Sequence, residues 1–291
     1  MTRVLALIGA LLLAFLSVSS ACTAASSDWI QFTLRSGNAG EGSIRTEFRS
    51  RPSGRDENNW STDFRPSELR GLDLAGFRSA GSRPLRFAVI REAGRLDCSG
   101  AGGNSRAMGN CSFTPDPGFM QLLLSRGIGR PTREQALGLA AVDARRELIE
   151  ALAAARYPTP SIDNLMALSA LDVSGSYISE MAAAGYRPRT LDTLVQFKAL
   201  DITPQWIAGF ARIGYADLPA DELVQLRALD ITPQYIGGFE RAGYRHLPVD
   251  KLVQLKAMDI TPDFVRAVAG NASALPDIGK LIELKTFGER H

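Results

Sequence analysis

Two columns of polar side chains recur at a fixed interval in the C-terminal half of the chain. One column consists of glutamines, and the other consists of a lysine or arginine two residues after each glutamine. A glutamine amide offers a ligand both a donor and an acceptor, and the cations attract acidic groups. The candidate ligand-facing residues are Gln196, Lys198, Gln225, Arg227, Gln254 and Lys256. The structural alternative is that these side chains form the solvated side of amphipathic helices.

A third column consists of aspartates that open each interval, among them Asp201, Asp230 and Asp259. Calcium loops gather several carboxylates, whereas these aspartates stand singly, so the pattern disfavours a metal site. Each of them precedes a threonine by two residues. We therefore expect a structural role in which the carboxylate hydrogen-bonds the start of a helix. No metal ion and no other cofactor is predicted.

Residues typical of a catalytic site are sparse. The sequence holds two histidines, His246 and His291, and it contains no HExxH motif and no serine or cysteine with an evident imidazole partner. We predict that the protein is not an enzyme. A hydrolase of unrecognised type is the alternative, and it would use acids such as Asp56, Glu57 and Asp63.

Two of the three cysteines, Cys98 and Cys111, flank a stretch rich in glycine and serine between two β-like segments. Facing strands of a hairpin would bring them to bonding distance, and an oxidising compartment would keep the bond formed. We predict a disulfide, with two buried reduced cysteines as the alternative. A zinc site is disfavoured because no other cysteine and no histidine lies near them in the sequence.

The N-terminus has the features of a secretory signal. An apolar run from Val4 to Val18 follows Arg3 and precedes three small residues. The run is short for a bilayer, so a signal peptide over residues 1–25 is favoured over a retained anchor. Cleavage before Cys22 would instead produce a lipoprotein lipidated at that cysteine, although Ser19 stands where the lipoprotein motif usually has leucine. Either route predicts an exported protein that is periplasmic, attached to the outer membrane, or secreted.

The charge of the chain disfavours two classes of partner. The sequence holds 33 basic and 31 acidic residues, for a net charge of +2, and both signs are spread along its length. This distribution provides neither a nucleic-acid footprint nor a membrane-seeking patch. We expect no nucleic-acid partner, and membrane contact only through a lipid on Cys22. The oligomeric state is left open.

Residues 28–113 have the signature of a β-rich domain. Apolar and polar residues alternate over Trp29–Arg35, Ser43–Phe48 and Leu85–Arg91, which places the apolar groups of each segment on one face. Stretches rich in glycine and serine separate these segments. The pattern predicts a small antiparallel β-sheet or sandwich.

Residues 114–288 are built from a repeat. The tetrad Asp-Ile-Thr-Pro begins at residues 201, 230 and 259, which gives a period of 29 residues, and six copies can be counted with degenerate outer ones. In each copy the threonine is placed as an N-cap and the proline as the first helical residue, as at Thr203 and Pro204. A glycine such as Gly214 ends this helix, and a second helix follows. Because such short helices cannot bury themselves alone, the sequence predicts an α+β chain whose repeats stack as an α-solenoid.

Two motif groups carry a resemblance to known proteins. They are Arg91-Glu92-Ala93-Gly94, Phe113-Thr114-Pro115 and Arg130–Gln135 within the segment Phe87–Leu139, followed by the Asp-Ile-Thr-Pro repeats. Together they resemble a group of uncharacterised exported bacterial proteins. The repeats are also similar to those appended to sensor metallopeptidases of the beta-lactam-receptor kind, where they lie outside the protease. The resemblance implies an extracytoplasmic sensing or protein-contact role and transfers no catalytic residue.

These observations lead to a non-catalytic extracytoplasmic binding or scaffold protein. Its helical repeat surface would contact another envelope protein or a peptide. The main alternative is a cell-wall or carbohydrate-binding protein that uses the β domain, with Trp29 or Trp60 as the aromatic contact.

Overall fold

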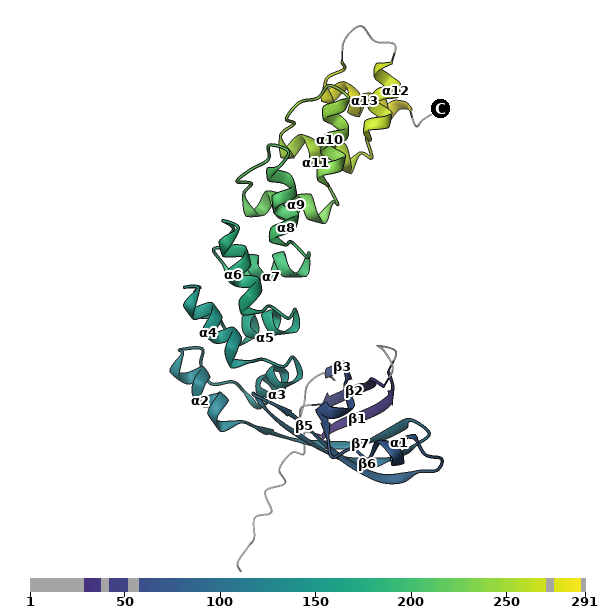
Figure 1. Cartoon of the computed structure of the whole chain (residues 1–291), viewed down its shortest axis with the longest axis vertical. Helices are drawn as coiled ribbons and strands as arrows, with labels where there is room; N and C mark the ends of the chain where they lie inside the picture. Colours follow the sequence, from purple (N-terminus) through teal and green to yellow (C-terminus); the bar gives the residue numbers. More distant parts are fainter. Residues whose placement is uncertain (1–28, 38–41, 52–57, 271–274, 289–291) are drawn as a thin grey trace, which may run out of the picture.

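The computed structural model describes residues 29–37, 42–51, 58–270 and 275–288. The chain is a mixed α+β protein in which a curled antiparallel sheet precedes a series of helical repeats (Figure 1). The predicted signal peptide and Cys22 lie outside the described residues. Within those residues, no helix is long and apolar enough to cross a membrane.

The sheet has seven strands in the order β3-β2-β1-β7-β6-β5-β4, and each neighbouring pair is antiparallel. The strands are β1 (Trp29–Ser36), β2 (Ile44–Arg51), β3 (Asn58–Phe64), β4 (Leu69–Arg70), β5 (Arg83–Arg91), β6 (Gly94–Gly103) and β7 (Arg106–Pro115). A short helix, α1 (Leu74–Arg78), lies between β4 and β5. The alternating segments of the sequence correspond to β1, β2 and β5. The described strands belong to one curled sheet rather than to a two-sheet sandwich.

One face of the sheet forms the core of the domain. Alternate residues of each strand point to this face, among them Phe32, Phe48 and Phe87, and Phe77 of α1 packs in the same cluster. The rings of Phe32 and Phe87 meet edge to face at 4.9 Å. The intervening residues of the same strands are largely exposed, so the opposite face of the sheet is polar.

The predicted disulfide is confirmed. Cys98 of β6 lies directly opposite Cys111 of β7 in the strand register, and the two sulfurs are bonded. Both cysteines are buried on the core face of the sheet. The bond therefore ties the longest hairpin of the domain from inside its core.

Twelve described helices follow the sheet as six pairs. The first helices are α2 (Pro117–Ser125), α4 (Arg146–Ala154), α6 (Gly175–Ala183), α8 (Pro204–Ala211), α10 (Pro233–Arg241) and α12 (Pro262–Ala269). The second helices are α3 (Arg133–Ala141), α5 (Ile162–Ala170), α7 (Leu191–Ala199), α9 (Ala220–Ala228), α11 (Val249–Ala257) and α13 (Ile278–Gly288). Each series starts anew every 29 residues, from 117 to 146 and from 133 to 162 onward. The helical repeats are thus confirmed, including both outer copies.

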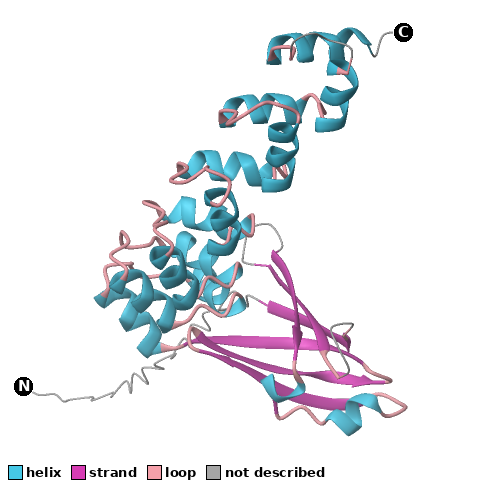
Figure 2. Ribbon diagram, turned by 45° about the horizontal axis from the view of Figure 1, so that its top comes forward, coloured by secondary structure: helices cyan, strands magenta, loops and turns pink. Residues whose placement is uncertain are grey.

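The second helices contact one another in chain order, from α3 through α5, α7, α9 and α11 to α13. The sheet and the first pairs lie side by side, and the later pairs extend away from the sheet (Figure 2). One buried cluster continues from Phe113 of the sheet through Phe119 of α2 and reaches Leu223 of α9. The sheet and the adjoining repeats therefore share a core.

The repeated threonines cap the first helices, as the sequence predicted. The side chain of Thr203 accepts a hydrogen bond from the Trp206 N–H, and Pro204 is the first residue of α8. Thr232 and Thr261 make the same contact at α10 and α12. Gly214 takes a φ of +88° after α8, which L side chains rarely adopt.

The repeated aspartates have a different role from the one expected. Asp201 has a φ of +53°, and Asp143, Asp172, Asp230 and Asp259 are also left-handed. The Asp201 N–H donates to the Lys198 carbonyl, and the Ile202 N–H donates to the Phe197 carbonyl. These two bonds make a Schellman motif, so the aspartate closes the preceding helix rather than opening the next one. Aspartate suits this position because it tolerates the left-handed region better than most residues.

Candidate functional site

The basic column of the repeats lies over aromatic rings. The charged group of Lys198 lies 4.9 Å from the Tyr177 ring centroid, and that of Lys256 lies 5.0 Å from the ring of Tyr235. Arg227 lies over Trp206 at 5.6 Å. In each pair the second helix supplies the cation and the first helix supplies the ring. The cations therefore join the two helices of a pair by cation–π contact.

The same cations also bind the preceding pair. Arg227 Nε donates to the Leu200 carbonyl at 2.7 Å, and Lys256 Nζ donates to the Asp230 carbonyl at 3.2 Å. Both carbonyls lie just after the preceding second helix, where the helix dipole favours a positive charge. Lys285 continues the series over Phe264 at 5.6 Å. We did not predict this fourth cation, although it lies one period after Lys256.

Tyrosine hydroxyls add a second set of bonds between repeats. Tyr177 donates to the Ile202 carbonyl at 2.8 Å, and Tyr215 donates to the Leu247 carbonyl at 2.7 Å. Burial raises the pKa of each of these phenols to about 12. They are therefore neutral donors at physiological pH, and they fix the spacing between pairs.

The glutamine column is exposed and takes little part in these internal contacts. Gln196, Gln225 and Gln254 lie on α7, α9 and α11 at equivalent positions. Gln254 accepts a hydrogen bond from Lys251 Nζ at 3.3 Å. The side chains of Gln196 and Gln225 make no hydrogen bond with any residue that the structure describes. The structure thus separates the two predicted columns, and a ligand-binding role for either stays a prediction.

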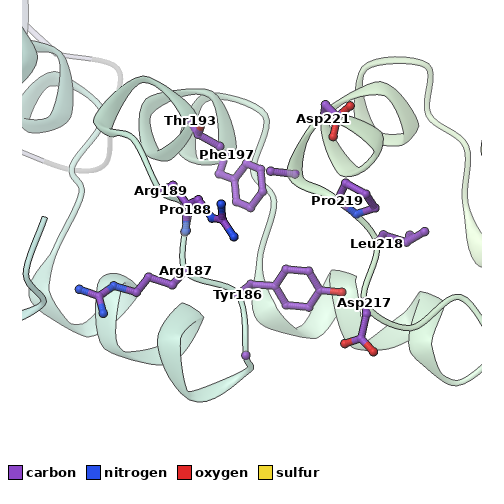
Figure 3. Close-up of a pocket in the computed structure, with 12 residues that line it drawn as sticks. Tyr186, Arg187, Pro188, Arg189, Thr193, Phe197, Asp217, Leu218, Pro219 and Asp221 are labelled. Atoms are coloured by element: carbon purple, nitrogen blue, oxygen red, sulfur yellow. The ribbon is translucent and has the colours of Figure 1, made fainter.

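A cleft of about 610 Å³ lies between the turns of neighbouring repeats (Figure 3). The turn after α6 supplies Arg187 and Arg189, and the turn before α9 supplies Asp217 and Asp221. In Figure 3 the ring of Tyr186 extends across the cleft toward Asp217. Two guanidinium groups and two carboxylates balance each other here, so the cleft favours neither anions nor cations.

A second groove, of about 530 Å³, lies where the sheet meets the array. Asn58, Asn59 and Trp60 of β3 line one side, and α3 and α5 supply an apolar wall with Leu137 and Met166. The Trp60 ring stacks on Phe48 at 5.1 Å, and Asn58 Nδ2 donates to Glu134 Oε1 at 2.8 Å. The groove therefore combines an aromatic ring, amides and an apolar wall. The side chain of Trp29, the other aromatic candidate, lies outside the described part of the structure.

Ionic contacts at this junction fix the sheet against the array. Arg91 of β5 lies 3.3 Å from Glu68 and 3.5 Å from Asp143, the first of the repeated aspartates. Glu92 Oε2 accepts a hydrogen bond from the Arg146 N–H at the start of α4. Burial would raise the pKa of Glu68, but hydrogen bonds from Arg65 and the charge of Arg91 hold it below its ordinary value. Sequence reasoning missed this cluster because its members follow no shared period.

The acids proposed for a hydrolase are only partly visible. Asp56 and Glu57 lie outside the described residues, and Asp63 forms an ion pair with Arg45 at 3.1 Å on the exposed face of the sheet. His246 stacks on Tyr215 at 4.8 Å in a turn between helices, while His291 lies outside the described residues. Across the described ranges, no group of three or more His, Cys, Asp or Glu residues is placed to hold a metal ion.

A comparison of the chain with known protein families, with curated proteins and with solved structures found no match.

Proposed function

We propose that the chain is a non-catalytic extracytoplasmic binding protein whose repeats form an α-solenoid and hold an extended segment of another envelope protein. One observation carries the proposal. Gln196, Gln225 and Gln254 occupy the same exposed position on successive second helices, while the cations two residues later make contacts within the array. The glutamine amides are the repeated polar groups least engaged in joining the repeats.

The spacing of the glutamines suits a peptide backbone. Packed helices lie about 8–10 Å apart, and an extended or polyproline II chain advances about 3.1–3.4 Å per residue. Successive glutamines would therefore meet peptide groups about three residues apart. Each amide can donate to a peptide carbonyl and accept from a peptide N–H.

The charge beside the glutamines favours some segments over others. Asp221 and Asp250 are exposed in the first turns of α9 and α11. A segment with neutral or basic side chains fits this surface better than an acidic segment does, because like charges repel at short range.

Site-specific photo-crosslinking in intact cells tests the proposal. A photoreactive residue at position 225 should give a discrete adduct with one envelope protein, and the same residue at Glu180 on α6 should not. The adduct should disappear when Gln196 and Gln254 are both replaced by alanine. A protein that gives equal adducts at both positions, or none at either, would not bind as proposed.

A second candidate function, cell-wall or carbohydrate binding, is favoured by the groove at the junction. Trp60 and the amides of Asn58 and Asn59 provide the aromatic and polar contacts that a glycan needs. Isolated peptidoglycan should then bind the wild-type protein but not Trp60→Ala. Retention of binding by Asn59→Ala and Trp60→Ala alike would remove this candidate.

The proposal includes export, with or without lipidation of Cys22. The intact mass of the protein made in a Gram-negative host separates the two routes. A diacylated or triacylated Cys22 would make it a lipoprotein, and a soluble species that begins near residues 22–26 would make it a free periplasmic or secreted protein.

A further inference from the structure

Two arginines at the far end of the sheet face each other without a counter-ion. Arg35 of β1 lies directly opposite Arg106 of β7 in the strand register. Both side chains are exposed, and neither forms a hydrogen bond or an ion pair with any residue in the described ranges. Like charges directly opposite in an antiparallel pair are destabilising. The sheet therefore holds an unfavourable pair that its own fold does not use.

A neighbouring arginine shows that the sheet can neutralise such charges. Arg45 of β2 lies opposite Arg35 on the other side. It forms an ion pair with Asp63 at 3.1 Å and donates to Ser61 Oγ at 2.8 Å. The unpaired state is thus particular to Arg35 and Arg106.

The two arginines line a hollow of about 480 Å³. Ser82 and Asn104 supply further polar groups, and no acidic side chain is among the residues that line it. Met108, which is 70% exposed, borders the same hollow. The combination of two guanidinium groups, neutral donors and one exposed apolar side chain distinguishes this site from the charge-balanced cleft between repeats.

The backbone holds the hollow in a fixed shape. The Asn104 N–H donates to the Ser79 carbonyl at 2.7 Å, and the Ser105 N–H donates to the Phe77 carbonyl at 2.9 Å. Gly103 packs so closely that an added Cβ would lie 1.8 Å from the Gly81 carbonyl oxygen. The tip of the β6–β7 hairpin is therefore held against the segment after α1, and the site is preformed.

We propose that Arg35 and Arg106 form a phosphate-binding site. Guanidinium groups match phosphate oxygens in charge and in bidentate geometry, and a bound dianion would relieve the repulsion between the two arginines. The exposed Met108 beside them suits a phosphate that is carried on an apolar group. Such a phosphate occurs in a lipid headgroup or in a soluble phosphate ester. This site is separate from the glutamine column and does not depend on it.

The affinity of the mature protein for inorganic phosphate, measured by calorimetry at constant ionic strength, tests the proposal. Arg35→Gln and Arg106→Gln should each weaken binding about tenfold or more, since each removes charge-assisted hydrogen bonds. Arg95→Gln is the matched control, because it removes the same charge from the same face at a residue paired with Asp97. Equal affinity in Arg35→Gln, or an equal loss in Arg95→Gln, would overturn the site.

Thermal unfolding without phosphate gives a second readout. Relief of the repulsion should raise the melting temperature of Arg35→Gln and Arg106→Gln by about 1–2 °C, whereas a purely structural arginine would lower it when replaced.

Vesicles of phosphatidylcholine, with and without phosphatidylglycerol, distinguish the two sources of phosphate. Phosphatidylglycerol-dependent binding that is weakened by Met108→Ser identifies a lipid headgroup. Binding of inorganic phosphate without vesicle binding identifies a soluble ester. Absence of both overturns the proposal.

Discussion

The sheet and the helical array use their polar residues in different ways. In the array, the repeated cations and tyrosines join each pair to its neighbours, and the aspartates close helices, so the exposed glutamines are the repeated polar groups left over. In the sheet, a whole face of polar side chains is left exposed. Residues 29–115 hold 13 basic and 9 acidic residues (13 − 9 = +4), and residues 116–288 hold 18 and 20 (18 − 20 = −2), so the two regions would select different partners. The difference teaches that repetition alone does not mark a binding residue, because most of the repeated groups have internal work.

The largest expected effect comes from the core that the two regions share. Phe119→Ala removes a fully buried ring of α2 and should cost about 3–5 kcal/mol. Because Phe119 belongs to the cluster that joins sheet and array, hydrogen exchange should accelerate in both regions. Phe239→Ala, at an equally buried ring near the C-terminal end, should accelerate exchange only in the last pairs. Identical exchange patterns for the two variants would show that the regions unfold as one unit.

Loss of the disulfide should act on the sheet alone. Replacing Cys98 and Cys111 by alanine opens a link with a sequence separation of 13, and a loop of this size stabilises by about 3 kcal/mol in the chain-entropy account. Denaturant unfolding followed by near-ultraviolet and far-ultraviolet circular dichroism should show an earlier loss of the sheet, with the last helical pairs unchanged. An unchanged midpoint for the sheet would contradict this.

Within one repeat, two neighbouring positions sharpen the comparison. Arg227→Ala removes a cation–π contact and a bond to the Leu200 carbonyl, and it should cost about 1–2 kcal/mol. Gln225→Ala, on the same helix, should change stability by less than about 0.5 kcal/mol. Chemical denaturation of both variants measures the difference. A loss on Gln225→Ala as large as that on Arg227→Ala would mean that the glutamine is structural.

The smallest effect concerns pH. The pKa of Glu68 is lowered in the folded protein, so the folded state favours its ionised form. The stability that this carboxylate contributes is present above its ordinary pKa of about 4.5 and is lost as the pH falls through the lowered value. Stability of Glu68→Gln should therefore fall less than that of the wild type on acidification. Parallel acid titrations of the two proteins would contradict the assignment.

Sequence reasoning reached the local features of this fold more readily than the long-range ones. The period of 29 residues, the Thr203 cap and the Cys98–Cys111 pair all follow from short-range rules of capping, repetition and hairpin pairing. The left-handed aspartates were misassigned because Asp-x-Thr suits a cap as well as a helix end, and the pattern does not separate the two. The Arg91 junction and the Arg35–Arg106 pair depend on strand register and chain reversal, which no motif in the sequence records.

The most direct test of the account is the affinity of the crosslinked partner for two variants of the mature protein. The account predicts that the triple variant Gln196→Ala, Gln225→Ala and Gln254→Ala folds with wild-type stability and loses at least about tenfold in affinity, or 1.4 kcal/mol. Arg35→Gln, on the sheet, should bind the same partner as the wild type does. Wild-type affinity in the triple variant would show that the glutamine column is only a solvated helix face.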